Sequence, residues 1–218
     1  MTENALVPSE MTGAVGKYGK EEDFDSLTRG SFLPRLQVMQ GSSGPVKEKK
    51  VAIGNLALIK GKDVIDLGEE VAAIVISWRS KAMDFDNTVS YYDKNSSSFK
   101  EIERKSKVEK QGFGVGPEFL IWLVDQKELA TLFCASATLQ REAPNVKAKM
   151  GDKCILASNY IDPPKSKFSW YGIQTKDCDY EVESPDWNLL TEEVNKFNNP
   201  PETEVEVADD DDSTGREQ

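Results

Sequence analysis

The sequence predicts a mainly β protein, either a barrel or a sandwich, with one C-terminal amphipathic helix and disordered tails. Short apolar, β-branched runs recur along residues 31–183, turn-forming residues separate them, and only one segment has a helical spacing of apolar residues. At 218 residues the chain has room for one domain of about 150 residues and its tails. We therefore expect a flexible N-terminal arm (1–30), a β-rich nucleic-acid-binding domain (31–183), a C-terminal helix (184–199) and an acidic tail (200–218).

Strands are expected where apolar residues alternate or run together. The run 71–78 is the clearest, because it is continuous and β-branched, as is typical of a buried strand. Residues 88–92 and 98–102 are expected to form a hairpin, and Pro144 is expected to break 138–150 into two short turns. The other expected strands are 32–40, 51–59 (broken or bulged), 64–67, 119–124, 129–135, 153–158 and 168–173.

Three glycines alternate in the sequence GFGVG, at positions 112, 114 and 116. A phosphate-binding loop would continue into Lys-Ser or Lys-Thr and a helix, and neither follows here. The glycines therefore predict a flexible hairpin loop.

The predicted helix begins after residue 183. Ser184 suits the N-cap and Pro185 suits the first helical position. Four apolar residues then fall on one face, and the Asn and Pro residues of 198–201 end the helix. These four residues are Trp187, Leu190, Val194 and Phe197. Their shared face predicts that the helix packs on the sheet.

The acidic charge is concentrated at the ends of the chain. The net charge is −9 over residues 184–218, −3 over 1–30 and +1 over 31–183. A tail with such charge and no apolar face is expected to be disordered. It could occupy a cationic groove until a nucleic acid displaces it. Its acidic residues, also the expected partner-binding residues, are Glu202, Glu204, Glu206, Asp209, Asp210, Asp211 and Asp212.

Several classes of protein are disfavoured by what the sequence lacks. It contains no histidine, which is the commonest general base and metal ligand. Its three cysteines are widely spaced and form no zinc or disulfide pattern. No apolar run is long enough for a membrane span, and no signal peptide is evident. We therefore expect a cytoplasmic protein without catalytic residues, bound metal, cofactor or membrane contact.

Two segments combine aromatic and basic residues, 78–110 and 141–171. Single-stranded nucleic acid favours this mixture, because bases stack on rings while cations contact phosphates. The structural alternative is that the rings are core residues and the lysines are ordinary surface residues. The candidates for stacking are Trp78, Tyr91, Tyr92, Phe99 and Trp170. The candidates for phosphate contact are Arg79, Lys81, Lys100, Arg104, Lys105, Lys147 and Lys149.

The order of these pieces resembles a group of tailed-phage proteins described as single-stranded-DNA-binding or DNA-replication accessory proteins. The resemblance lies in FLPRLQVMQ (32–40), IGN (53–55), ISWRSKAMDF (76–85) and CASATLQR (134–141). It implies an OB-fold-like barrel, a cationic aromatic groove and an acidic tail that recruits replication or recombination enzymes. One departure is the ending Arg216-Glu217-Gln218, where many such tails end in an apolar or aromatic residue.

The leading hypothesis is a sequence-tolerant single-stranded-DNA-binding protein of phage replication or recombination, in the host cytoplasm if the protein is viral. One rival is a virion, assembly or protein-interaction β-domain, which would form a stable homo-oligomer without DNA affinity. Another rival is a nuclease built on carboxylates, which would need Mg²⁺.

Overall fold

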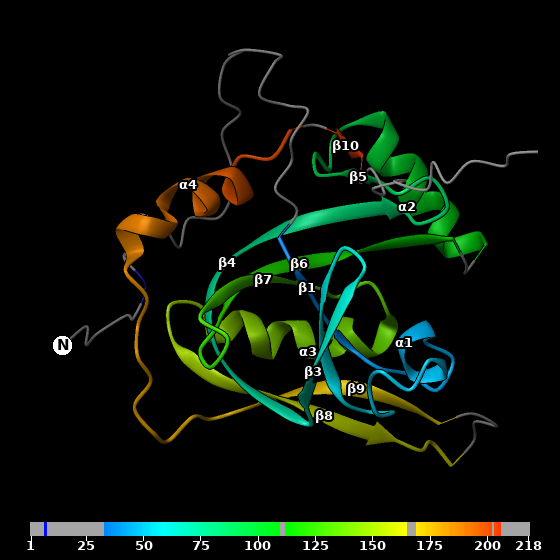
Figure 1. The fold of residues 1–218 in the computed structure, drawn as a ribbon. Helices are drawn as coiled ribbons and strands as arrows, with labels where there is room; N and C mark the ends of the chain where they lie inside the picture. Colours follow the sequence, from blue (N-terminus) through cyan, green and yellow to red (C-terminus); the bar gives the residue numbers. More distant parts are fainter. Residues whose placement is uncertain (1–6, 8–32, 110–111, 165–168, 202, 206–218) are drawn as a thin grey trace, which may run out of the picture.

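The computed structural model describes residue 7 and residues 33–109, 112–164, 169–201 and 203–205. In this part of the chain ten strands form one mixed sheet, on which four helices pack (Figure 1). The strands are β1 (Arg35–Val38), β2 (Leu56–Lys60), β3 (Asp63–Gly68), β4 (Glu70–Asp84), β5 (Val89–Tyr91), β6 (Phe113–Leu123), β7 (Glu128–Phe133), β8 (Lys153–Ile161), β9 (Trp170–Lys176) and β10 (Thr203–Val205). The helices are α1 (Gly44–Lys47), α2 (Ser97–Val108), α3 (Ala137–Ala148) and α4 (Trp187–Asn198). The prediction of a mainly β fold is therefore confirmed.

The long strand β4 organises the sheet. The main path runs β10-β5-β4-β6-β7-β1-β2-β3, and β8 and β9 branch from β4. On one edge, β4 pairs with β8 through residues 70–74 and with β5 through residues 82–84. Its other edge pairs with β6, with a register shift between Val75 and Ser77. Such a bulge increases local bending and twist, which suits a strand shared by two parts of a curved sheet.

The curvature brings β9 close to β1. The Gln40 side chain donates a hydrogen bond to the Tyr171 carbonyl (2.7 Å) and accepts one from the Tyr171 backbone N–H (3.0 Å). The Gln40 side chain thus gives the Tyr171 backbone the two hydrogen bonds that a neighbouring strand would otherwise give it. Apart from β1 and β7, which are parallel, the strands pair antiparallel.

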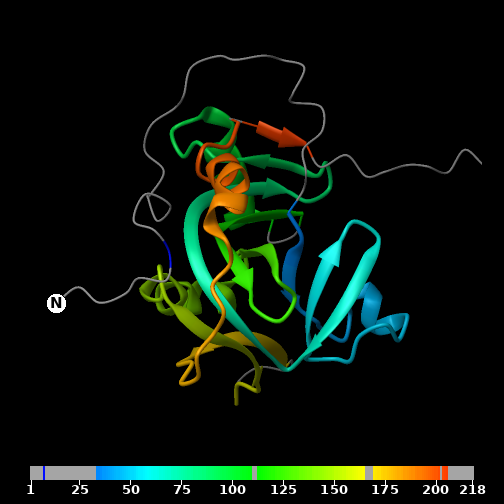
Figure 2. The same cartoon turned by 60° about the vertical axis from the view of Figure 1, so that its left-hand side comes forward.

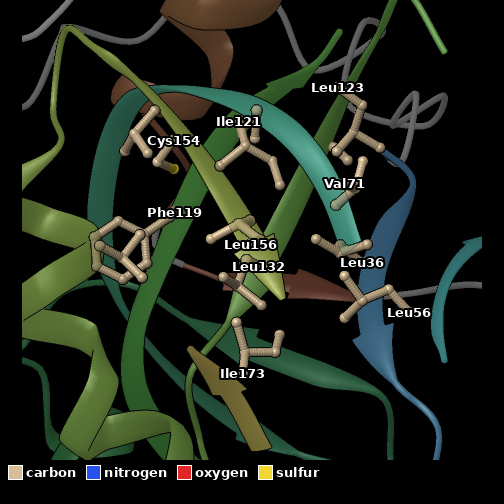
Figure 3. Packing of buried hydrophobic residues seen from close by; sticks show 14 of the residues in the cluster. Leu36, Leu56, Val71, Phe119, Ile121, Leu123, Leu132, Cys154, Leu156 and Ile173 are labelled. Carbon is tan, nitrogen blue, oxygen red and sulfur yellow. The ribbon is translucent and has the colours of Figure 1, made fainter. Parts of the chain in front are cut away.

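The larger core fills the inside of the curved sheet, where α3 contributes Ala143 and Val146. The core takes residues from seven strands, β1, β2, β4, β6, β7, β8 and β9. Figure 3 shows Phe119, Ile121 and Leu156 among them. Because neighbouring residues of a strand face opposite sides, β4 supplies a second core with Ile74 and Ile76.

The second core lies beneath α4, which runs across the sheet near β4 (Figure 2). Val194 and Phe197 are buried there, and Trp187 and Leu190 pack against them, which confirms the predicted apolar face. The helix begins at Trp187 with Asp186 as its N-cap, two residues later than predicted. Val7 is also fully buried in this core, so this residue of the predicted flexible arm packs against the folded domain.

Two helices replace structures that the sequence predicted differently. Ser97–Val108 is α2 and not the second strand of a hairpin. The Ser96 hydroxyl caps it by accepting a hydrogen bond from the Phe99 N–H (3.1 Å). Ala137–Ala148 is one continuous helix, α3, with Pro144 inside it.

Two further expectations are corrected. Gly114 and Gly116 lie within strand β6 and not in a flexible loop. The acidic tail, predicted to be disordered, contributes β10, which pairs antiparallel with β5. Among the described residues no helix has both the length and the apolar character needed to span a membrane.

Candidate nucleic-acid interface

Arg79 and Lys81 lie in a buried ion network. Glu118, which is 2% exposed, accepts hydrogen bonds from Arg79 Nε (2.6 Å) and Lys81 Nζ (2.9 Å). The Arg79 guanidinium lies between the rings of Tyr92 and Phe197, at 3.9 and 4.2 Å from their centroids. It also donates hydrogen bonds to the Tyr92 hydroxyl and to the Phe197 carbonyl.

This network is structural. Burial by itself raises the pKa of Glu118, but the charges of Arg79 and Lys81 and their hydrogen bonds outweigh it and hold that pKa below its ordinary value. The two cations therefore neutralise an internal carboxylate. The prediction that Arg79 and Lys81 contact phosphate and that Tyr92 stacks on a base is not supported by this placement, since all three are largely buried.

The candidates on α2 are divided between core and surface. Phe99 is 4% exposed and packs with Ala82 and Ile102 beneath the helix, so it is a core residue and not a stacking residue. The three cations are on or near the surface, but each has a partner. Lys100 donates to the Asn95 carbonyl, Arg104 pairs with Glu101, and Lys105 lies 3.9 Å from the same carboxylate.

A depression of about 310 Å³ lies where β5 meets α2. The partly buried ring of Tyr91 forms part of its wall, beside Lys105. Asp84 and Glu101 also line it. Because two carboxylates accompany Lys105 in this lining, the depression does not favour a phosphate.

Two cationic candidates lie at the end of α3, Lys147 in its last turn and Lys149 as its C-cap. Lys147 Nζ lies 4.0 Å from the centroid of the Trp78 ring, which is partly buried. Lys149 pairs with Asp177 (2.6 Å), and that hydrogen bond raises the pKa of Lys149. Lys147 is exposed, and among the described residues it forms no ion pair.

A second ring beneath a lysine lies on the same face of the sheet. Lys105 Nζ is 5.2 Å from the ring centroid of Phe113, which pairs with Asp84 of β4. Trp78 and Asp84 are six residues apart with no register shift between them, so they share one face at a separation of about 20 Å. Phe113 was not among the predicted site residues, because its position depends on the pairing of β4 with β6.

The remaining candidates are apart from this face or outside the described residues. Trp170 is partly buried at the start of β9, opposite Ile161. Glu204 lies in β10 opposite Ser90. The other predicted tail residues, Glu202, Glu206 and Asp209 to Asp212, lie outside the described residues.

No protein-family model, no curated protein and no solved structure matches this chain. Within the described ranges, no three Cys, Asp or Glu side chains come together as a metal-binding group.

Proposed function

We propose that this protein binds single-stranded DNA with little sequence preference, without catalysis, in phage DNA replication or recombination. The observation that carries the proposal is the pair of rings beneath lysines on one face of β4 and β6, Trp78 with Lys147 and Phe113 with Lys105. Bases stack on any aromatic face, at about 1–3 kcal/mol per base, while the cations contact the phosphates. The separation of about 20 Å is within the length of a short single strand.

We also propose that the curved sheet is an OB-fold-like barrel that is only partly closed. The two hydrogen bonds between Gln40 and Tyr171 support this, because they link β9 to the end of β1. OB folds commonly bind single-stranded nucleic acid on one face of the sheet.

Removing one ring or one cation tests the proposed face. Trp78→Ala or Lys147→Glu is expected to weaken binding to an oligothymidine by about fivefold to tenfold, through lost stacking or lost phosphate contact. Fluorescence anisotropy of a labelled oligonucleotide measures the change. Lys62→Glu is the matched control for Lys147→Glu, since Lys62 is an exposed lysine in the β2–β3 turn. Equal effects of the two charge reversals would argue against this face.

The acidic tail supports a second part of the proposal, competition for the DNA site. Because β10 pairs with β5, Thr203 lies opposite Tyr91, and the last residue of β10, Val205, lies opposite Val89. Residues 206–218 carry six acidic side chains and one basic one. The same charges are suited to recruiting basic replication or recombination partners.

Deleting residues 206–218 is expected to tighten DNA binding by about threefold to tenfold in low salt, because a competing polyanion is removed. This deletion retains β10. Replacing Asp209, Asp210, Asp211 and Asp212 with Asn, at constant chain length, should give part of the same gain. The competition model is contradicted if both changes leave the affinity unaltered or weaken it.

A further inference from the structure

Two tyrosines form an exposed aromatic pair on the β8–β9 hairpin. Tyr160 and Tyr171 are directly opposite each other in the antiparallel register. Their ring centroids are 5.1 Å apart with an interplanar angle of 55°. Tyr160 is 56% exposed, so one ring is largely open to solvent while the other supports it.

The supporting ring is held from two other parts of the chain. Gly54 has a φ of +86°, and a Cβ atom there would lie 2.5 Å from Cε1 of Tyr171. Glycine is therefore required both for the backbone conformation and for the room that the ring occupies. The Gln40 amide fixes the Tyr171 backbone through its two hydrogen bonds. The aromatic pair is thus preorganised, which lowers the entropic cost of binding a flat ligand.

Basic residues precede the turn that supports the pair. The segment 47–50 reads Lys-Glu-Lys-Lys and leads through Val51 to Gly54. Lys50 pairs with Glu48 (2.9 Å), whereas Lys47 and Lys49 are exposed and form no ion pair within the described part of the chain. Figures 1 and 2 both show α1 and the β8–β9 hairpin at the end of the molecule away from α2 and β10.

Lys49 occupies a left-handed backbone conformation, with a φ of +61°. A residue with a Cβ atom is strained there, and glycine would adopt the same conformation without strain. Lys49→Gly therefore removes one cation while relieving the backbone, which makes it a useful variant.

We propose that the Tyr160–Tyr171 pair is a second base-stacking site, where a nucleobase of single-stranded DNA stacks on Tyr160 while Lys47 and Lys49 contact neighbouring phosphates. This inference rests on the proposed function. A nucleic acid fits the surface better than an apolar protein partner does, because the segment that leads to Gly54 beneath the Tyr171 ring carries Lys47 and Lys49, whose charges phosphates would neutralise. Ile53, 52% exposed beside the same turn, offers apolar contact to the base or sugar.

The test measures anisotropy of a labelled oligothymidine of about 20 nucleotides with the full-length protein and four variants. Tyr160→Ala and Lys49→Gly are expected to weaken binding by at least about fivefold and about threefold. The matched controls are Tyr180→Ala, at a tyrosine that is 54% exposed, and Lys62→Gly, at an exposed turn lysine. Both controls should bind within about twofold of the unaltered protein.

The outcomes separate this inference from the proposed function. If the unaltered protein binds and Tyr160→Ala binds like Tyr180→Ala, the second site is wrong while the proposed function stands. If the unaltered protein does not bind the oligonucleotide at all, both fail. Crosslinking of a 4-thiothymidine oligonucleotide to Tyr160, located by mass spectrometry, would support the second site directly, and crosslinking only at Trp78 or Phe113 would overturn it.

Discussion

Replacing Arg79 with alanine is expected to lower the free energy of unfolding by about 3–5 kcal/mol. The substitution leaves Glu118 buried with only Lys81 as a charged partner, and an imperfectly paired buried carboxylate is strongly destabilising. It also removes the guanidinium from between Tyr92 and Phe197, and with it the hydrogen bond to the last turn of α4. Urea denaturation followed by far-ultraviolet circular dichroism measures the change.

Arg104→Ala is the matched control for this prediction. Arg104 also pairs with a glutamate through two hydrogen bonds, but both side chains are exposed, at 63% and 46%. Solvent screens such an exposed pair, so its loss should change the free energy of unfolding far less than the loss of Arg79. If both variants lose a similar amount of unfolding free energy, the buried network of Arg79, Lys81 and Glu118 does not stabilise the fold as described.

Replacing Gly116 with alanine is expected to lower the free energy of unfolding by about 3 kcal/mol or more. A Cβ atom at position 116 would lie 2.1 Å from the carbonyl oxygen of Cys134, which is a backbone atom and cannot rotate away. The chain after β7 would have to move, and with it the connection to α3. Thermal and urea unfolding of the variant measure the loss.

Gly44→Ala controls for the change from glycine to alanine itself. Gly44 begins α1, and nothing lies within 4 Å of the position that its Cβ atom would take. This variant should be neutral or more stable by about 0.5 kcal/mol, because alanine reduces the freedom of the unfolded chain. An unaltered stability of Gly116→Ala would show that β6 and the Cys134 backbone are farther apart than described.

The sequence predicted the elements whose signal is local. The buried strand over 71–78 was recognised from its continuous β-branched run, and it extends to Asp84 as part of β4. The apolar face of α4 was recognised from its spacing. The helix α2 was not predicted, because its sequence is mostly polar and only Phe99 and Ile102 are buried. Ion pairs on its surface, such as Lys107–Glu103, also stabilise it.

The candidate site was predictable only in part, because it depends on strand pairing. Arg79 and Lys81 were indistinguishable in sequence from surface cations, since their partner Glu118 is distant in the chain and is brought opposite Arg79 by the register of β4 and β6. Trp78 and Lys147 were both candidates, but only the packing of α3 joins them. Tyr160 was not predicted as a site residue, because the aromatic pair depends on Tyr171 in the opposite strand and on Gly54 beneath the Tyr171 ring.

The proposed function requires that rings and cations of the folded domain bind single-stranded DNA. Intrinsic tryptophan fluorescence, measured while an oligothymidine is added at about 50 and 200 mM salt, tests it most directly. The proposed function predicts strong quenching at low salt and an affinity lower by at least about tenfold at high salt, because binding releases counterions. Unchanged fluorescence together with a large mass by light scattering would contradict it in favour of an assembly protein, and cleavage of the oligonucleotide in Mg²⁺ would contradict it in favour of a nuclease.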